Sequence, residues 1–96
     1  MTESKIKPLA QGSLIVEERI ANEVTYGANS AMPATFDLTK QGYQFIGCVG
    51  FDTYNPGLVP ISMPHLDSTS QAWFRNVTNS SIKSKVRIRA LFMYVG

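Results

Sequence analysis

The sequence predicts an all-β fold, an antiparallel β-sandwich or jelly-roll-like domain of about seven or eight short strands. Turn signals recur about every 8 to 12 residues, a spacing that is typical of such folds. No segment shows a sustained helical period of apolar residues with caps at its ends. The length of 96 residues, with 44% hydrophobic and 17% charged residues, fits one compact domain better than two.

The first residues differ in character from the rest of the chain. Residues 1–13 are polar, carry Pro8 and Gly12, and show no sustained periodicity, so we expect an N-terminal arm or linker there. The β-sandwich domain is then expected over residues 14–96.

The next segment contains three expected strands. Residues 14–20 could form a strand or a short helix: the β-branched pair Ile15–Val16 favours a strand, whereas Glu17–Arg19 favours a helix. We take the strand interpretation. Two further strands are expected at residues 23–26 and 34–38.

The central segment, "GYQFIGCVGFDTYN" at residues 42–55, predicts a dense core strand. Its glycines, such as Gly47 and Gly50, indicate bulges or the close approach of another backbone. The following "NPG" is a strong turn signal. Residues 58–63 then predict an edge or bulged strand, because Pro60 cannot donate to a sheet ladder.

The last third of the chain predicts a loop and two strands. We expect a loop at residues 67–70, a strand at 71–77 and a hairpin connection at 78–84. The final and longest strand is expected at residues 83–95.

The end of that strand is apolar on both faces. Residues 91–95 are apolar at every position, so one side chain row faces the core and the other needs a separate cover. Leaving a side chain such as Leu91 in water forfeits about 2 kcal/mol, and a domain of this size has little surface of its own to spare. We therefore expect copies of the chain to associate there. The predicted interface residues are Leu91, Met93, Val95, Arg87 and Arg89.

Three basic residues, Lys85, Arg87 and Arg89, alternate along the same strand and are expected to share one face. They are interpreted as a solvated stripe, as partners of Glu17, Glu18 or Glu23 across a subunit contact, or as a site for an anionic polymer. The net charge of only +2 does not argue for nucleic acid, and the stripe lacks interleaved exposed aromatic residues.

The residues that carry catalysis are scarce, and we expect no enzyme and no cofactor. The single histidine, His65, rules out a two-histidine metal site within one chain, and no G-x-S-x-G elbow is present. The only cysteine, Cys48, cannot form an internal disulfide and is interpreted as a buried small hydrophobe rather than a reactive thiol. No segment has the apolar length of a signal peptide or a membrane span, so we expect synthesis in the cytoplasm and no membrane insertion.

Trp73 and Phe74 are adjacent in an expected strand, so one of them must face away from a one-sided core. An outward Trp73 is interpreted as part of a subunit interface or as a platform for a sugar ring. The two N-x-[ST] sequences at residues 76–78 and 79–81 are interpreted as turns rather than glycosylation sites. The candidate ligand-binding residues are Tyr54, Asn55, His65, Asp67 and Trp73.

From Thr35 onward, the segments "GYQFIGCVGF", "VPISM", "FRNVTNSS" and "KVRIRALFMYV" follow one another in a known order. This order resembles the small C-terminal β-sandwich domains, the knobs or heads, of bacteriophage tail, neck and head fibres and receptor-binding proteins. The resemblance implies a homotrimeric virion component that binds a host cell-surface polysaccharide. The alternative is a capsid- or tail-decorating module that binds other virion proteins and no glycan. A small hydrolase or nucleic-acid-binding barrel is the least favoured reading.

Overall fold

The computed structural model describes residues 10–65 and 70–96, and within them it contains antiparallel strands and no helix. The predicted all-β class is confirmed. The strands form three small sheets, in the orders β1-β8-β4, β2-β7 and β3-β6-β5. The strands are β1 (Leu14–Ile20), β2 (Val24–Tyr26), β3 (Ala31–Thr35), β4 (Tyr43–Asp52), β5 (Leu58–Ser62), β6 (Gln71–Asn76), β7 (Ile82–Ser84) and β8 (Arg87–Tyr94).

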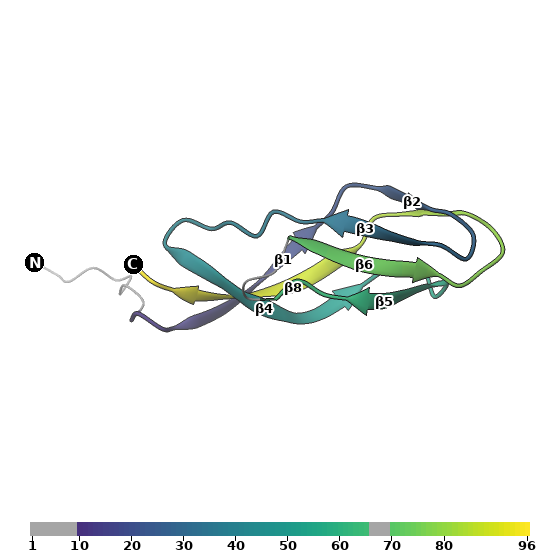
Figure 1. Ribbon diagram of the computed structural model, residues 1–96. Coiled ribbons are helices and arrows are strands. Elements are labelled where there is room, and N and C mark those ends of the chain that lie inside the picture. The colour runs from purple at the N-terminus through teal and green to yellow at the C-terminus, as the bar shows by residue number, and fades with distance from the viewer. Residues whose placement is uncertain (1–9, 66–69) are drawn as a thin grey trace, which may run out of the picture.

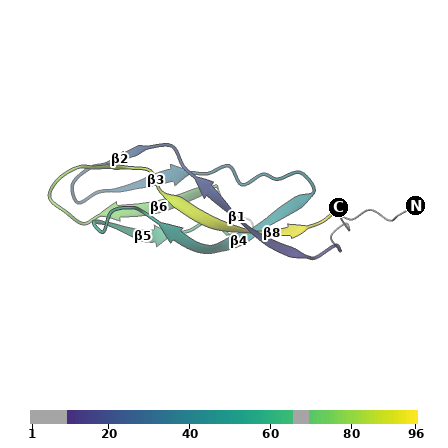
Figure 2. The same cartoon turned by 180° about the vertical axis from the view of Figure 1, so that it is seen from behind.

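The sheets form an elongated, two-layered body (Figures 1 and 2). The Cα radius of gyration is 16.5 Å, whereas a compact chain of this length has about 12 to 13 Å. The β3-β6-β5 sheet lies against only part of the β1-β8-β4 sheet. Beyond it, the connection at residues 36–42 runs along the inner side of the longer sheet, which extends the molecule (Figure 1).

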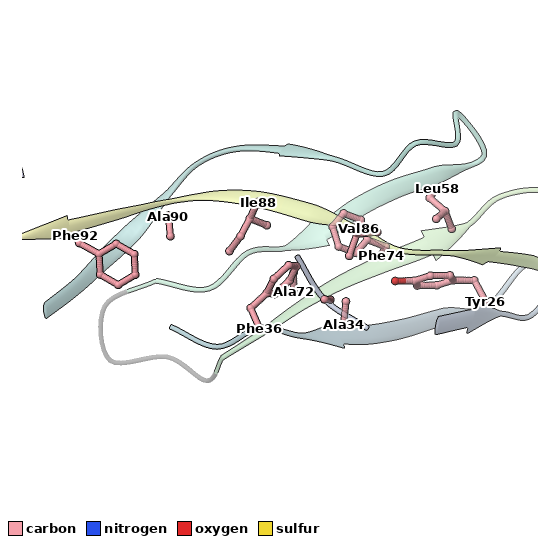
Figure 3. Packing of buried hydrophobic residues seen from close by; sticks show 11 residues of the cluster. Tyr26, Ala34, Phe36, Leu58, Ala72, Phe74, Val86, Ile88, Ala90 and Phe92 are labelled. Carbon is pink, nitrogen blue, oxygen red and sulfur yellow. The ribbon is translucent and has the colours of Figure 1, made fainter. Parts of the chain in front are cut away.

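The core lies between the two three-stranded sheets (Figure 3). The ring of Phe74 on β6 is 6.0 Å from that of Phe51 on β4, measured between centroids. The phenol of Tyr26 is completely buried, and burial raises its pKa above the ordinary value. The buried apolar residues are Ala21, Tyr26, Ala34, Phe36, Leu58, Ala72, Phe74, Val86, Ile88, Ala90 and Phe92.

Several strand predictions are confirmed in detail. β1 occupies the predicted residues 14–20. The register of β4 against β8 shifts between Phe45 and Gly47 and again between Cys48 and Gly50, so the glycine-rich segment does contain bulges. β5 is an edge strand whose register shifts between Pro60 and Ser62.

Two strand predictions are wrong. The final strand does not run unbroken over residues 83–95, because β7 ends at Ser84 and β8 begins at Arg87. Ser84 Oγ lies 3.0 Å from the carbonyl oxygen of Thr53 and 2.8 Å from that of Lys85, so its single O–H can donate to either, and such side-chain bonds compete with a regular ladder. β7 therefore pairs with β2, where only a hairpin connection was expected.

The strand expected at residues 34–38 lies earlier, at Ala31–Thr35, and includes Pro33. Proline is tolerated there because β3 is at the edge of its sheet. The chain before β1 is also hydrogen-bonded. The amide of Gly12 donates to the carbonyl of Tyr94 at 2.8 Å, so the folded body includes residues directly before 14.

A cluster of charged side chains covers the inner side of β1. Glu17 pairs with Arg19 and with Lys40, whose Nζ lies 2.6 Å from Glu17 Oε2. The Arg19 guanidinium lies 4.9 Å from the centroid of the Phe92 ring and donates to the carbonyl of Asp37 at 2.9 Å. These contacts fasten the connection at residues 36–42 to β1.

This cluster predicts a pH dependence of stability. A hydrogen bond from Lys40 is the main cause, and one from Arg19 the second cause, that holds the pKa of Glu17 below its ordinary value. This lowered pKa stabilises the folded state fully at a pH above the pKa that Glu17 has in the unfolded chain. The stabilisation is lost as the pH falls through the lower pKa that Glu17 has in the folded state. We expect Glu17→Gln to remove this pH-dependent part of the free energy of unfolding, up to about 1 kcal/mol, when urea unfolding is measured between pH 3 and 7. Glu23→Gln is the control because Glu23 and Lys83 are both largely exposed and 3.9 Å apart; equal pH profiles for the two variants would contradict the prediction.

Candidate functional site

The candidate site is the outer face of the β1-β8-β4 sheet, the face turned away from the core. The two ladders place side chains of the three strands in rows across this face. Two rows are mainly apolar and two carry charges. The rows are Leu14–Met93–Gln44, Val16–Leu91–Gly47, Glu18–Arg89–Gly50 and Ile20–Arg87–Asp52.

The apolar half of the outer face is open. Leu14 is 57% exposed and Val16 is 51% exposed, while Leu91 and Met93 are half-buried by their neighbours in the sheet. A Cβ atom placed on Gly47 would meet nothing within 4 Å. The face therefore has open space beside Leu91 that a side chain from another molecule can fill.

The charged half of the outer face is centred on two arginines. Arg87 lies between Glu18, at 3.0 Å, and Asp52, at 3.2 Å, and its guanidinium carbon is 5.4 Å from the centroid of the Tyr54 ring. The Arg89 side chain lies over Gly50. Within residues 10–65 and 70–96, no ion pair engages Arg89.

The structure brings four of the five predicted interface residues onto this face. Leu91, Met93, Arg87 and Arg89 all point outward from β8, whereas Val95 lies just after the strand and is 44% exposed. The charge of Arg87 is matched within the chain by Glu18 and Asp52.

Lys85 is not part of the arginine row, because the strand is interrupted at its position. Sequence reasoning also missed the contribution of Leu14 and Val16. Their alternation with Ile15 was visible, but only the pairing of β1 with β8 places them beside Met93 and Leu91.

Two of the predicted ligand-binding residues, Tyr54 and Trp73, lie on different layers. Tyr54 contacts Arg87 at the end of the outer face, whereas Trp73 lies on the outward side of the β3-β6-β5 layer. Asn55 is part of a turn, since its Oδ1 accepts a hydrogen bond from the Gly57 amide at 2.8 Å. His65 is exposed, and Asp67 lies outside the described residues.

Trp73 is the centre of a second surface. It is 38% exposed, whereas Phe74 is fully buried, so one of the two does face away from the core. Pro33 on β3 and Ser62 on β5 lie directly opposite Trp73 in the sheet. Arg75 shares this side and donates to the carbonyl of Asn29 at 2.9 Å. The result is a partly exposed indole with Ser62 and Arg75 as polar neighbours.

The first N-x-[ST] sequence is a structural turn. Asn76 is completely buried. Its Nδ2 donates to the carbonyls of Tyr26 and Ser80 at 2.9 and 2.7 Å, and its Oδ1 accepts from the amide and hydroxyl of Thr78 at 2.9 and 2.7 Å. A side chain that is buried and bonded at each polar atom is not available to a glycosylating enzyme.

Other functional groups are sparse in the part of the chain that the structure describes. It holds no group of three side chains of the metal-binding types. Cys48 is half-buried, and its thiol donates to the carbonyl of Gly50 at 3.2 Å. No helix long enough to cross a bilayer occurs among these residues.

Comparison of the chain with protein-family models, with curated proteins and with solved structures found no match.

Proposed function

We propose that this protein is a non-enzymatic structural and adhesion module of a bacteriophage virion, and that its copies associate through the outer face of the β1-β8-β4 sheet. The open apolar half of that face supports the association, and the resemblance of the sequence pattern to fibre-tip domains supports the virion setting. Leu14 and Val16 remain more than half exposed beside Leu91 and Met93, and contiguous apolar surface of this kind is typical of interaction sites.

The charged half of the outer face suits a second copy of the same chain, because it carries both arginines and carboxylates. Interfaces combine an apolar centre with a polar rim. Arg89 has five N–H donors and no ion pair among the described residues, so a carboxylate of a neighbouring copy is a suitable partner. The chain supplies such a carboxylate in Glu18, whose Oε2 pairs with Arg87 of its own chain at 3.0 Å and whose other oxygen can accept from Arg89 of a neighbouring copy.

Adhesion to a host polysaccharide is supported by the Trp73 surface. It lies on the layer opposite the outer face, so association through the outer face leaves it accessible. A flat indole stacks on the apolar face of a pyranose ring, while neighbours such as Arg75 and Ser62 suit its hydroxyl groups. The alternative is a decorating module in which the same surface contacts another virion protein.

The test of self-association is a pair of matched variants measured by light scattering. Val16 and Val77 are both 51% exposed, but only Val16 lies on the outer face. We expect the wild type to exceed the monomer mass of 10.6 kDa. Val16→Lys should raise the dissociation constant about tenfold or more, because a buried valine contributes roughly 1.5 kcal/mol, and Val77→Lys should leave it unchanged.

A wild-type protein that stays at 10.6 kDa at every concentration would refute association. Once assembly is established, binding of the assembled protein to a glycan array supports adhesion, and binding only to virions supports decoration.

A further inference from the structure

The free edge of β1 is the least protected one among the edge strands of five or more residues that the structure describes. β1 pairs with β8 in one uninterrupted register over all seven of its residues. On its other side, no described strand is paired with it. An edge of this kind presents unpaired N–H and C=O groups and is a template for another strand.

The hydrogen-bonding pattern shows which backbone groups point to that edge. Just outside β1, the carbonyl of Ser13 accepts from Tyr94 and the amide of Ala21 donates to Val86. Antiparallel pairs alternate between bonded and non-bonded, so the odd-numbered residues of β1 bond to β8 and the even-numbered ones point away. The carbonyl of Glu18 points to this edge, where the Arg19 side chain donates to it at 3.2 Å, so strand pairing at Glu18 must replace this contact. The outward backbone groups belong to Leu14, Val16, Glu18 and Ile20.

The other long strands at sheet edges carry features that oppose pairing. β3 contains Pro33, and β5 contains Pro60 and a register shift. β4 has two register shifts, at the segments that contain Gly47 and Gly50. Prolines and bulges are the devices by which natural proteins blunt edge strands. β1 has neither, and its even-numbered apolar side chains are more than half exposed.

We propose that β1 pairs edge to edge and antiparallel with β1 of a second copy of this chain, so that two β1-β8-β4 sheets become one six-stranded sheet. This inference rests on the proposed self-association and adds a contact at the strand edge to the contact through the outer face. The occupant is a second copy because the sequence of β1 is complementary to itself when it is reversed.

The complementary register places Glu18 at the two-fold axis. Val16 then lies opposite Ile20 of the second copy, and Glu17 lies opposite Arg19, so apolar residues meet apolar residues and opposite charges meet. Even-numbered residues face even-numbered ones, as the outward backbone groups require. The two Glu18 carboxylates near the axis are offset by arginines, since Arg87 of each copy already lies 3.0 Å from its own Glu18.

Edge pairing has a consequence for symmetry. The contact is the same on both copies, so it makes two-fold assemblies with an even number of copies. This differs from the three copies that the resemblance to fibre knobs implies. The outer faces of the two copies would lie side by side on one continuous sheet, which doubles the open apolar surface around Val16.

The test is amide hydrogen exchange of the full chain, followed by NMR at increasing protein concentration. When the total concentration is about 100 times the dissociation constant, the amides of Val16 and Glu18 should exchange at least about tenfold more slowly than in dilute protein, because the monomer fraction of a homodimer falls only with the square root of concentration. The exposed turn residue Asn79 is the control and should not change. Packing through the outer face alone would not protect the backbone amides that point to the free edge of β1.

Proline substitutions give a second readout. Val16→Pro keeps an apolar side chain but removes an outward N–H, so the monomer should keep its circular dichroism spectrum and dimerisation should weaken at least about tenfold. Ile15→Pro removes an N–H that bonds to β8 and should destabilise the monomer instead. If Val16→Pro fails to fold, the exchange measurement on the wild-type chain still decides whether β1 pairs edge to edge.

The outcomes separate the two proposals. A chain that is monomeric at all concentrations overturns both self-association and edge pairing. Assembly without slowed exchange at Val16 and Glu18, or with an odd number of copies, overturns edge pairing alone. If these amides exchange as slowly in dilute protein as in concentrated protein, the chain covers its own edge, and edge pairing is overturned as well.

Discussion

Replacing Asn76 by aspartate is expected to destabilise the protein by about 3 to 5 kcal/mol, enough to unfold most small domains. The Asn76 side chain is completely buried and donates to two backbone carbonyls, those of Tyr26 and Ser80. A carboxylate there has no N–H to donate, and its charge faces two carbonyl oxygens away from water. Urea unfolding followed by circular dichroism measures the loss.

Asn79→Asp is the matched control. Asn79 lies three residues further on in the same turn, is exposed, and accepts one hydrogen bond from Asn29 at 3.1 Å. We expect a change within about 0.5 kcal/mol, as for other surface substitutions. Similar losses for the two variants would mean that the network of Asn76 does not hold the β2, β6 and β7 segments together.

Truncation of Phe74 is expected to cost a similar amount, about 3 to 5 kcal/mol. Phe74 is completely buried between the sheets, and its ring lies against that of Phe51. Phe74→Ala removes the buried ring and leaves a cavity that the surrounding strands fill only in part. The midpoint of urea unfolding should fall sharply, or the variant should be unfolded in water.

The adjacent Trp73→Ala variant is the control for Phe74→Ala. Trp73 is the larger side chain, yet it is 38% exposed on the outward side of the same strand. We expect a smaller loss of stability than for Phe74→Ala and a protein that still folds. If Trp73→Ala were the more damaging change, the assignment of the inner and outer sides of β6 would be incorrect. A folded Trp73→Ala variant is also the sample in which loss of glycan binding can be interpreted.

Much of the fold was predictable because local chemistry determines it. The β-branched pair Ile15–Val16 indicates β1, and Pro60 indicates an edge strand. The break between β7 and β8 was not predictable, because it depends on a bond from Ser84 to Thr53, 31 residues away in the sequence. Side-chain bonds of that kind arise only when distant strands meet.

The candidate site was predictable only in part, for the same reason. The apolar end of the chain indicated that Leu91 and Met93 need a cover, and both lie on the open outer face. The sequence could not show that Tyr54 and Trp73 lie on different layers, because strand order decides which side chains share a surface. It also could not show that Arg87 finds its carboxylates within its own chain.

The chain enters and leaves the folded body at one tip. Gln11 Nε2 donates to the carbonyl of Val95 at 3.1 Å, while the turns after β2 and β6 lie at the opposite tip (Figure 1). A fluorescent protein fused after Gly96 would therefore sit at one pole of a rod, and a dye on the exposed Asn79 would report from the other. Energy transfer between labels on different copies would measure how the rods are oriented relative to one another in an assembly.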